Sequence, residues 1–141
     1  MSGFTAKVCS LTHQGVMQML SAAVAKAEEI EQPQCIVIVD ASCVVLGELR
    51  MTGAKVLSMK SALSKARTAA SIRAPSDMIP DDVGPRIAAA TDNAVTNLGG
   101  GLPVIVGGMC IGGIGVGSGT PDQDKEVARA ALEAINATFE W

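Results

Sequence analysis

His13 is the only histidine in the chain, and an imidazole can act as a general acid, a general base or a metal ligand near neutral pH. A lone histidine cannot build a three-histidine zinc site. The chain has no GxSxG elbow, and no cysteine stands in a sequence context that pairs it with His13. These residues disfavour hydrolytic zinc and covalent nucleophilic chemistry. They leave ligand binding or general acid/base catalysis on a bound molecule.

Thr120 begins a strong helix start, because Pro121 follows it and Gln123 occupies the reciprocal position of a capping box. Backbone N–H groups at a helix start attract anions. The carboxylates of the same turn, Asp124 among them, compete for that partial positive charge, so ordinary capping is the alternative to an anion site. Residues 99–101 are three glycines, which are either an additional N–H nest for a carboxylate or a plain flexible turn.

Four glycines alternate at and beyond the end of one predicted strand, and they share one of its faces if the strand continues regularly: Gly113, Gly115, Gly117 and Gly119. A face without side chains allows something to approach the backbone closely. Both a packed helix backbone and a flat ligand satisfy this pattern. A dinucleotide loop does not, because its glycines open a helix within a strand–helix–strand unit.

Length and composition limit the partners. The chain has 141 residues, of which 48% are hydrophobic, and a formal net charge of −3, which predicts one mildly acidic globular domain over residues 1–141. No Lys/Arg run is present, which argues against a nucleic acid or an anionic membrane as partner. Two Phe, one Trp and no Tyr leave too few aromatic rings for base stacking. Small molecules and other protein chains remain.

The four cysteines show no CxxC spacing, and three lie in or beside apolar runs, as reduced cysteines do. Residues 1–14 contain no apolar leader, and no stretch reaches the roughly 18 to 20 apolar residues of a membrane span. We therefore expect a cytoplasmic protein that does not enter the membrane.

Apolar residues at steps of three and four predict two long helices, over residues 12–30 and 54–72. Short apolar runs predict two hairpins, with strands at 35–39 and 43–51 and at 102–106 and 109–116, the second hairpin turning at Gly107-Gly108. A short Ala-rich helix is predicted around 86–95, between loops, and a last helix from 120 to the C-terminus. No strand–helix–strand alternation requires a parallel sheet. The prediction is an α+β fold, an antiparallel sheet from two hairpins covered by helices.

Six segments, taken in order, resemble the GlcG/HbpS haem-binding family, which is related to the C-terminal domain of PduO-type proteins. They are Asp40-Ala41-Ser42, residues 50–54, 65–70, 100–104, 111–116 and 119–124. The resemblance implies a profilin-like α/β/α domain that assembles into homo-oligomers, often octamers. It also implies either haem binding or a small-molecule role within a catabolic operon.

The resemblance gives His13 a specific role, because some haem-binding relatives use a histidine on this helix as the axial ligand of the iron. The alternative is a helix-start histidine in partial contact with solvent. Met51 is predicted to line the pocket, since methionine adapts to irregular apolar ligands.

Arg50 and Lys65 are basic residues inside the resembling motifs. Together they could clamp a carboxylate, Arg50 by its guanidinium fork and Lys65 as a point charge. Thr68 would add a hydroxyl, and Gly100 and Gly101 would form the wall of the shared pocket. The alternatives are solvation at the surface, or an ion pair between Arg50 and Glu48.

Three functions follow as hypotheses. The first is a small-ligand-binding oligomer with haem as leading ligand. The second is a small catabolic isomerase, lyase or hydrolase acting on a carboxylate through Lys65, Arg50 and Asp124, and the third is an accessory structural oligomer. Two departures from the family pattern, Thr52 in place of Asp and Ser42 in place of Gly, weaken any site that needs a carboxylate beside Arg50.

Overall fold

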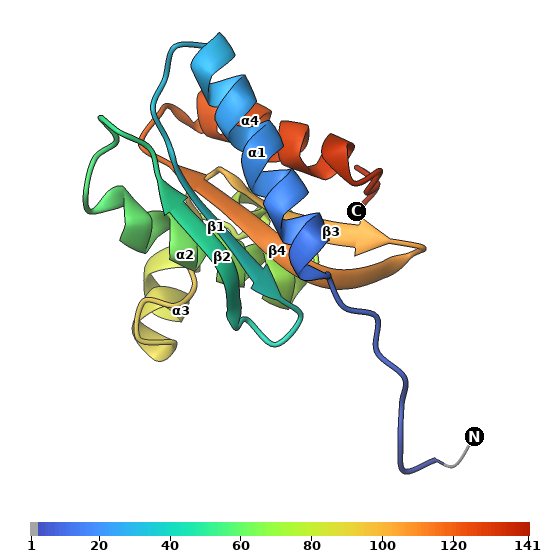
Figure 1. Cartoon of the computed structure of the whole chain (residues 1–141). Coiled ribbons are helices and arrows are strands. Elements are labelled where there is room, and N and C mark those ends of the chain that lie inside the picture. Colours follow the sequence, from blue (N-terminus) through green and yellow to red (C-terminus); the bar gives the residue numbers. More distant parts are fainter. Residues whose placement is uncertain (1–2) are drawn as a thin grey trace.

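The computed structural model describes residues 3–141. The elements follow in chain order as α1 (His13–Glu29), β1 (Cys35–Asp40), β2 (Val45–Arg50), α2 (Ser58–Ile72), a 3-10 turn (Ser76–Met78), α3 (Gly84–Ala90), β3 (Gly101–Val106), β4 (Met109–Gly117) and α4 (Pro121–Ala134). Figure 1 shows the helices arranged around one twisted sheet.

The sheet is antiparallel and has four strands in the order β2-β1-β4-β3. Each predicted hairpin forms, and the two hairpins join because β1 pairs with β4, with Cys35 opposite Gly117 and Asp40 opposite Gly112. β1 is a central strand with five of its six residues buried, in agreement with its continuous apolar run. The predicted α+β fold is confirmed.

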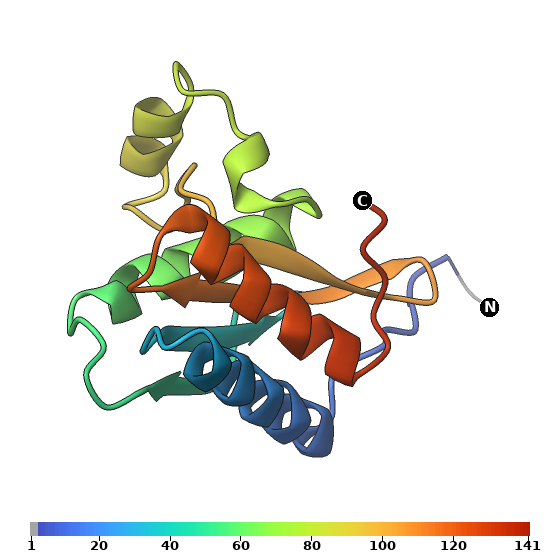
Figure 2. The same cartoon turned by 90° about the horizontal axis from the view of Figure 1, so that it is seen from above.

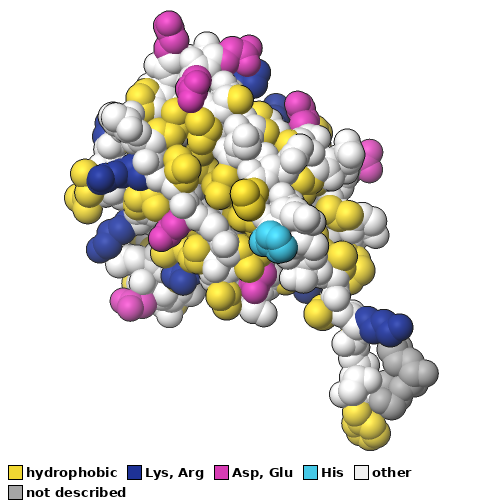
Figure 3. Space-filling view, in the orientation of Figure 1, with side chains coloured by type: hydrophobic (Ala, Val, Ile, Leu, Met, Phe, Trp, Pro, Cys, Tyr) yellow, Lys and Arg dark blue, Asp and Glu magenta, His cyan; other side chains and the backbone are white. Residues whose placement is uncertain are grey.

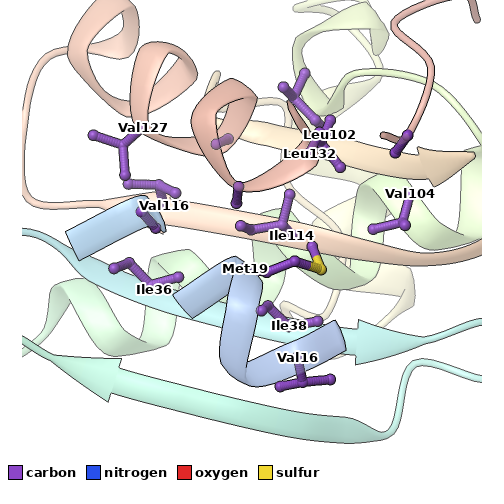
Figure 4. Packing of buried hydrophobic residues seen from close by; sticks show 14 of the residues in the cluster. Val16, Met19, Ile36, Ile38, Leu102, Val104, Ile114, Val116, Val127 and Leu132 are labelled. Atoms are coloured by element: carbon purple, nitrogen blue, oxygen red, sulfur yellow. The ribbon is translucent and has the colours of Figure 1, made fainter. Parts of the chain in front are cut away.

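Helices cover both faces of the sheet. Figure 2 shows α1 and α4 side by side on one face and α2 on the other. On the α1/α4 face, Ile36 and Ile38 of β1 and Ile114 and Val116 of β4 pack against Met19 and other apolar residues of the helices (Figure 4). On the other face a smaller cluster joins β1 to α2.

The alternating glycines of β4 lie under α2. A Cβ added to Gly115 would collide with the carbonyl oxygen of Ala62, and one added to Gly113 would collide with that of Ala66. Gly117 lies against Ser58 of the same helix. The packed helix backbone therefore accounts for three of the four glycines, while Gly119 lies beyond the end of the strand.

Three predicted boundaries are wrong. α2 begins at Ser58 instead of residue 54, because the residues after β2 form turns first. The helix expected around 86–95 is α3 at Gly84–Ala90, where Pro85 occupies the first turn and needs no N–H partner. α4 ends at Ala134 instead of reaching the C-terminus, and the segment beyond it turns back so that Thr138 bridges Ile105 of β3.

Candidate functional site

Lys65 and Asp124 form a buried ion pair that joins α2 to α4 past the end of β4. The Lys65 Nζ donates to Asp124 Oδ2 at 3.0 Å and to the carbonyl oxygen of Val116 at 2.9 Å. The two side chains are only 6% and 3% exposed. The other carboxylate oxygen of Asp124 accepts the N–H of Gly119 at 3.0 Å, so the pair is anchored on both sides.

Gly100 and Gly101 pack against this pair, although the pocket shared by Arg50 and Lys65 that they were expected to wall does not form in one chain. A Cβ on Gly100 would lie 3.2 Å from Lys65 Nζ and 2.9 Å from the Cβ of Asp124. Gly100 has a φ of 118°, a backbone conformation that favours glycine. Gly101 packs against the Lys65 carbonyl, and its N–H donates to the Ser76 hydroxyl at 2.9 Å.

A hollow of about 260 Å³ opens beside the ion pair. Its lining carries two ammonium groups, Lys55 and Lys65, the Asp124 carboxylate and three hydroxyls, Ser58, Ser61 and Ser118. An ammonium carries three N–H donors. Two of the three N–H groups of Lys65 are used by the hydrogen bonds to Asp124 and to the Val116 carbonyl. Asp124 neutralises Lys65, so the hollow offers a small oxyanion the Lys55 ammonium and the hydroxyls.

Sequence reasoning did not select the serines of this hollow, although a signal was present. Ser58, Ser61 and Lys65 are spaced by three and four residues, which places them on one face of α2. Ser118 offers no such signal, since it follows β4 and reaches the hollow only through the fold.

Arg50 lies at the end of β2, away from this hollow. It lines a separate hollow of about 600 Å³ together with Met51, Thr52 and the C-terminal part of α1. Met51 contacts the backbone there, its sulfur accepting the N–H of Gln34 at 3.4 Å. The prediction that Arg50 and Lys65 share one pocket is wrong within a single chain, because β2 is an edge strand and Lys65 reaches toward the end of β4.

Two threonines of the predicted site form internal bonds. Thr68 is fully buried; its hydroxyl donates to the Ser64 carbonyl at 2.7 Å and accepts the N–H of Thr96 at 2.9 Å, which ties α2 to the segment before β3. Thr120 caps α4, and the reciprocal bonds with Gln123 complete the predicted capping box. Neither residue is on the lining of the Lys65 hollow.

His13 is the first residue of α1 and is exposed. In Figure 3 the histidine lies on the face where hydrophobic side chains are exposed. Met17, one turn further along α1, is 66% exposed. His13 lines neither hollow described above, so its imidazole is accessible from solvent.

The thiols inside the fold are poor nucleophiles. Burial raises the pKa of Cys35, and burial is also the largest cause that raises the pKa of Cys43, partly opposed by Arg67. Both thiols therefore stay protonated at neutral pH. Among residues 3–141, no three His, Cys, Asp or Glu side chains gather into a metal site, and no helix is long and apolar enough to cross a membrane.

Residues 11–133 match the family model described as "Haem degrading protein HbpS-like". An uncharacterised 15.0 kDa protein from the dhaT-dhaS intergenic region of Citrobacter freundii is 34% identical over 135 residues, covering 92% of this chain and 95% of that protein. The corrinoid adenosyltransferase PduO of the same organism is 33% identical over 132 residues, but the match spans 90% of this chain and only 39% of PduO.

Solved structures share the whole fold. The Klebsiella pneumoniae protein ORFY superposes with a TM-score of 0.91 at 31% identity, over 98% of this chain and 99% of ORFY. A complex of PduOC with heme superposes with a TM-score of 0.86 at 29% identity, over 94% of this chain and all of PduOC.

Proposed function

Because this chain belongs to the HbpS-like family, we propose that it is a small-ligand-binding protein and that haem is its leading ligand. The observation that carries the proposal is the accessible imidazole of His13 at the start of α1. The likeness to PduOC, whose structure was solved with heme, supports it.

The residues around His13 fit a haem in chemical type. The imidazole would provide a neutral nitrogen to the iron, and Met17 would contact the apolar macrocycle. When bound, haem would supply an iron centre capable of redox chemistry. A single chain leaves this surface open to solvent, so we infer that a second copy completes the site in a homo-oligomer.

The test is a haem titration followed by the Soret absorbance. His13→Ala is expected to shift the Soret maximum and weaken binding about tenfold or more, since even the loss of an outer-shell partner of a metal ligand costs about 10- to 100-fold. Gln14→Ala, the neighbouring exposed residue on α1, serves as the matched control. Cys43→Ser and Cys110→Ser should also leave the spectrum unchanged.

A haem adsorbed on an apolar patch would not respond to the loss of one imidazole. An unchanged spectrum and affinity in His13→Ala would therefore overturn the haem assignment.

A second candidate function is the binding or turnover of a small carboxylate in the Lys65 hollow. It is favoured by the two ammonium groups and three hydroxyls on that lining. Asp124 would hold Lys65 in place, and any proton transfer would fall to Lys65. Arg50 has no part in this version, since it lines the other hollow.

An NMR titration with acetate tests this candidate. Shifts confined to the amides around Ser118 and Ser58 are expected, and Lys55→Met should reduce the affinity without unfolding the chain, because that residue is exposed. Arg50→Met is the control. Equal shifts in the Lys55→Met protein would contradict an anion site here.

A further inference from the structure

The outer edge of β2 is open. β2 is the first strand in the sheet order, and in the described part of the chain only β1 pairs with it. An unpaired strand edge is a template for another extended segment. Three apolar side chains beside or within β2 are also exposed: Val44, Leu46 and Leu49.

The register determines which backbone groups face outward. The N–H of Met51 donates to the carbonyl of Gln34 on the β1 side at 3.0 Å, and Arg50 and Glu48 lie one and three residues before Met51. Because hydrogen-bonding direction alternates along a strand, the N–H groups of Arg50 and Glu48 point away from β1. Two donors and their carbonyls are thus presented at this edge.

The opposite edge of the sheet is covered differently. The segment after α4 lies against β3, where the N–H of Thr138 donates to the carbonyl of Ile105 at 3.0 Å. The chain's own C-terminal segment therefore occupies part of that edge, and β2 is the edge that remains available.

Residues 3–12, here called the arm, form an extended segment that leads away from the body (Figure 1). Phe4 and Val8 are 97% and 84% exposed. Phe4, Ala6 and Val8 alternate with polar or small residues, which is the period of a strand with one apolar face. An exposed segment with this pattern is suited to strand addition.

We propose that the arm of one copy adds as a fifth strand to the β2 edge of a second copy. The apolar face of the arm then lies on the same side as Leu49, next to the hollow behind β2. Lys7, on the other face of the arm, comes to the side of Glu48, so the charges are complementary. The arm leads directly into His13, so this contact would also bring a partner's surface to the start of α1.

The occupant is a second copy because the arm runs away from its own sheet. Val16 and Leu20 of α1 lie over Gly47, so the arm would have to reverse direction at Thr12 to reach its own β2. The inference stands apart from haem binding, since it needs no ligand.

Cross-linking tests the contact with the native thiol of Cys9, which is exposed on the arm. The protein used for cross-linking carries Glu48→Cys together with Cys43→Ser and Cys110→Ser. It is treated with a short bis-maleimide at low protein concentration. Paired strands lie about 4.8 Å apart, so a covalent dimer is expected. It should disappear when Cys9→Ser is added, and Asp82→Cys, an exposed position near α3, should give none.

Other outcomes overturn the proposal. A dimer that persists in Cys9→Ser would indicate direct pairing of two β2 edges. Equal cross-linking of the Asp82→Cys protein would indicate random collision. If the Glu48→Cys protein gave no dimer, the arm would not pair with the β2 edge.

A second measurement avoids introduced thiols. Phe4→Asp with Val8→Asp is expected to raise the dimer dissociation constant at least tenfold in analytical ultracentrifugation, because two apolar contacts are lost. These positions are exposed, so the fold itself should not change. Cys9→Ser is the control on the opposite face of the arm, and an unchanged constant in the double variant would also overturn the proposal.

Discussion

At the scale of single residues, Lys65 and Asp124 form a buried, hydrogen-bonded ion pair between two helices. The two residues are 59 positions apart and meet only because α2 and α4 begin at the same end of the sheet. Resemblance selected both residues, but no periodicity in the sequence indicates that they pair. Because both side chains are buried, breaking the pair is costly: a substitution that removes one partner leaves the other charged and without solvent.

Lys65→Met is therefore expected to lower the free energy of unfolding by about 3–5 kcal/mol. Urea denaturation followed by circular dichroism measures this. Lys65→Met combined with Asp124→Leu removes both charges and should recover a substantial part of the loss. A double variant as unstable as the sum of two single variants would contradict the coupling.

Cys43 provides a residue-scale test of pH dependence. Burial raises the pKa of its thiol, so the neutral form persists above the ordinary thiol range and its thiolate appears only at higher pH. The pKa of the Cys43 thiol is higher in the folded than in the unfolded protein. Its contribution to the free energy of unfolding is therefore present at neutral pH and is lost as the pH rises through the pKa of the folded state.

We expect iodoacetamide to modify Cys9 before Cys43 at pH 8, with the Cys43 rate increasing steeply above pH 9. Mass spectrometry of the alkylated peptides gives both rates. Equal alkylation rates for the two cysteines at pH 8 would show that the Cys43 thiol is not shielded from the reagent and that its pKa is not raised.

At the scale of elements, periodic patterns and local cap and turn signals predicted which helices and hairpins form, whereas several helix boundaries were wrong. The steps of three and four along α1 and the capping box at Thr120 are local signals, and both elements begin where expected. The helix predicted around 86–95 begins earlier, at Gly84, with Pro85 in its first turn. The glycines of β4 left two interpretations open, since a strand alone does not reveal what covers it.

Gly115→Ala is expected to destabilise the fold by about 3 kcal/mol or more, because the new methyl meets the backbone of α2 at Ala62. Gly108→Ala is the matched control; it has a φ of 78° but nothing within 4 Å, so about 1 kcal/mol is expected from the backbone alone. Thermal or urea unfolding measures both. Equal losses would mean that α2 can shift away from β4.

At the scale of the whole molecule, some residues of the candidate sites, such as Lys65 and Arg50, could be named from the sequence, but the serines beside Lys65 and the grouping of all these residues could not. Arg50 and Lys65 stand in neighbouring motifs, yet the edge position of β2 separates them. Conversely, Ser118 joins Lys65 although nothing in its local sequence predicts this. Distances between elements depend on strand order, which composition and periodicity do not specify.

The homo-oligomer proposed above predicts more than one copy in solution. Phe4, Met17 and Leu57 are among several large hydrophobics that are more than 60% exposed, and contact with a second copy would cover such side chains. Light scattering at micromolar concentration is expected to return a multiple of 14.4 kDa. A mass near 14.4 kDa would contradict both the oligomer and the arm contact.

The bare face of β4 also bears on the order in which the molecule assembles. The α1/α4 layer rests on large aliphatic side chains from β1, β3 and β4, whereas the α2 layer draws its buried apolar contacts from β1 and from its own alanines. α2 therefore gains little until β1 and β4 are aligned, and it should dock late and open first. In native-state hydrogen exchange, the amides of α2 are expected to exchange through an opening of lower free energy than the opening that exposes the amides of β1 and β4. The layer that carries Lys65 would then loosen while the rest of the protein stays folded.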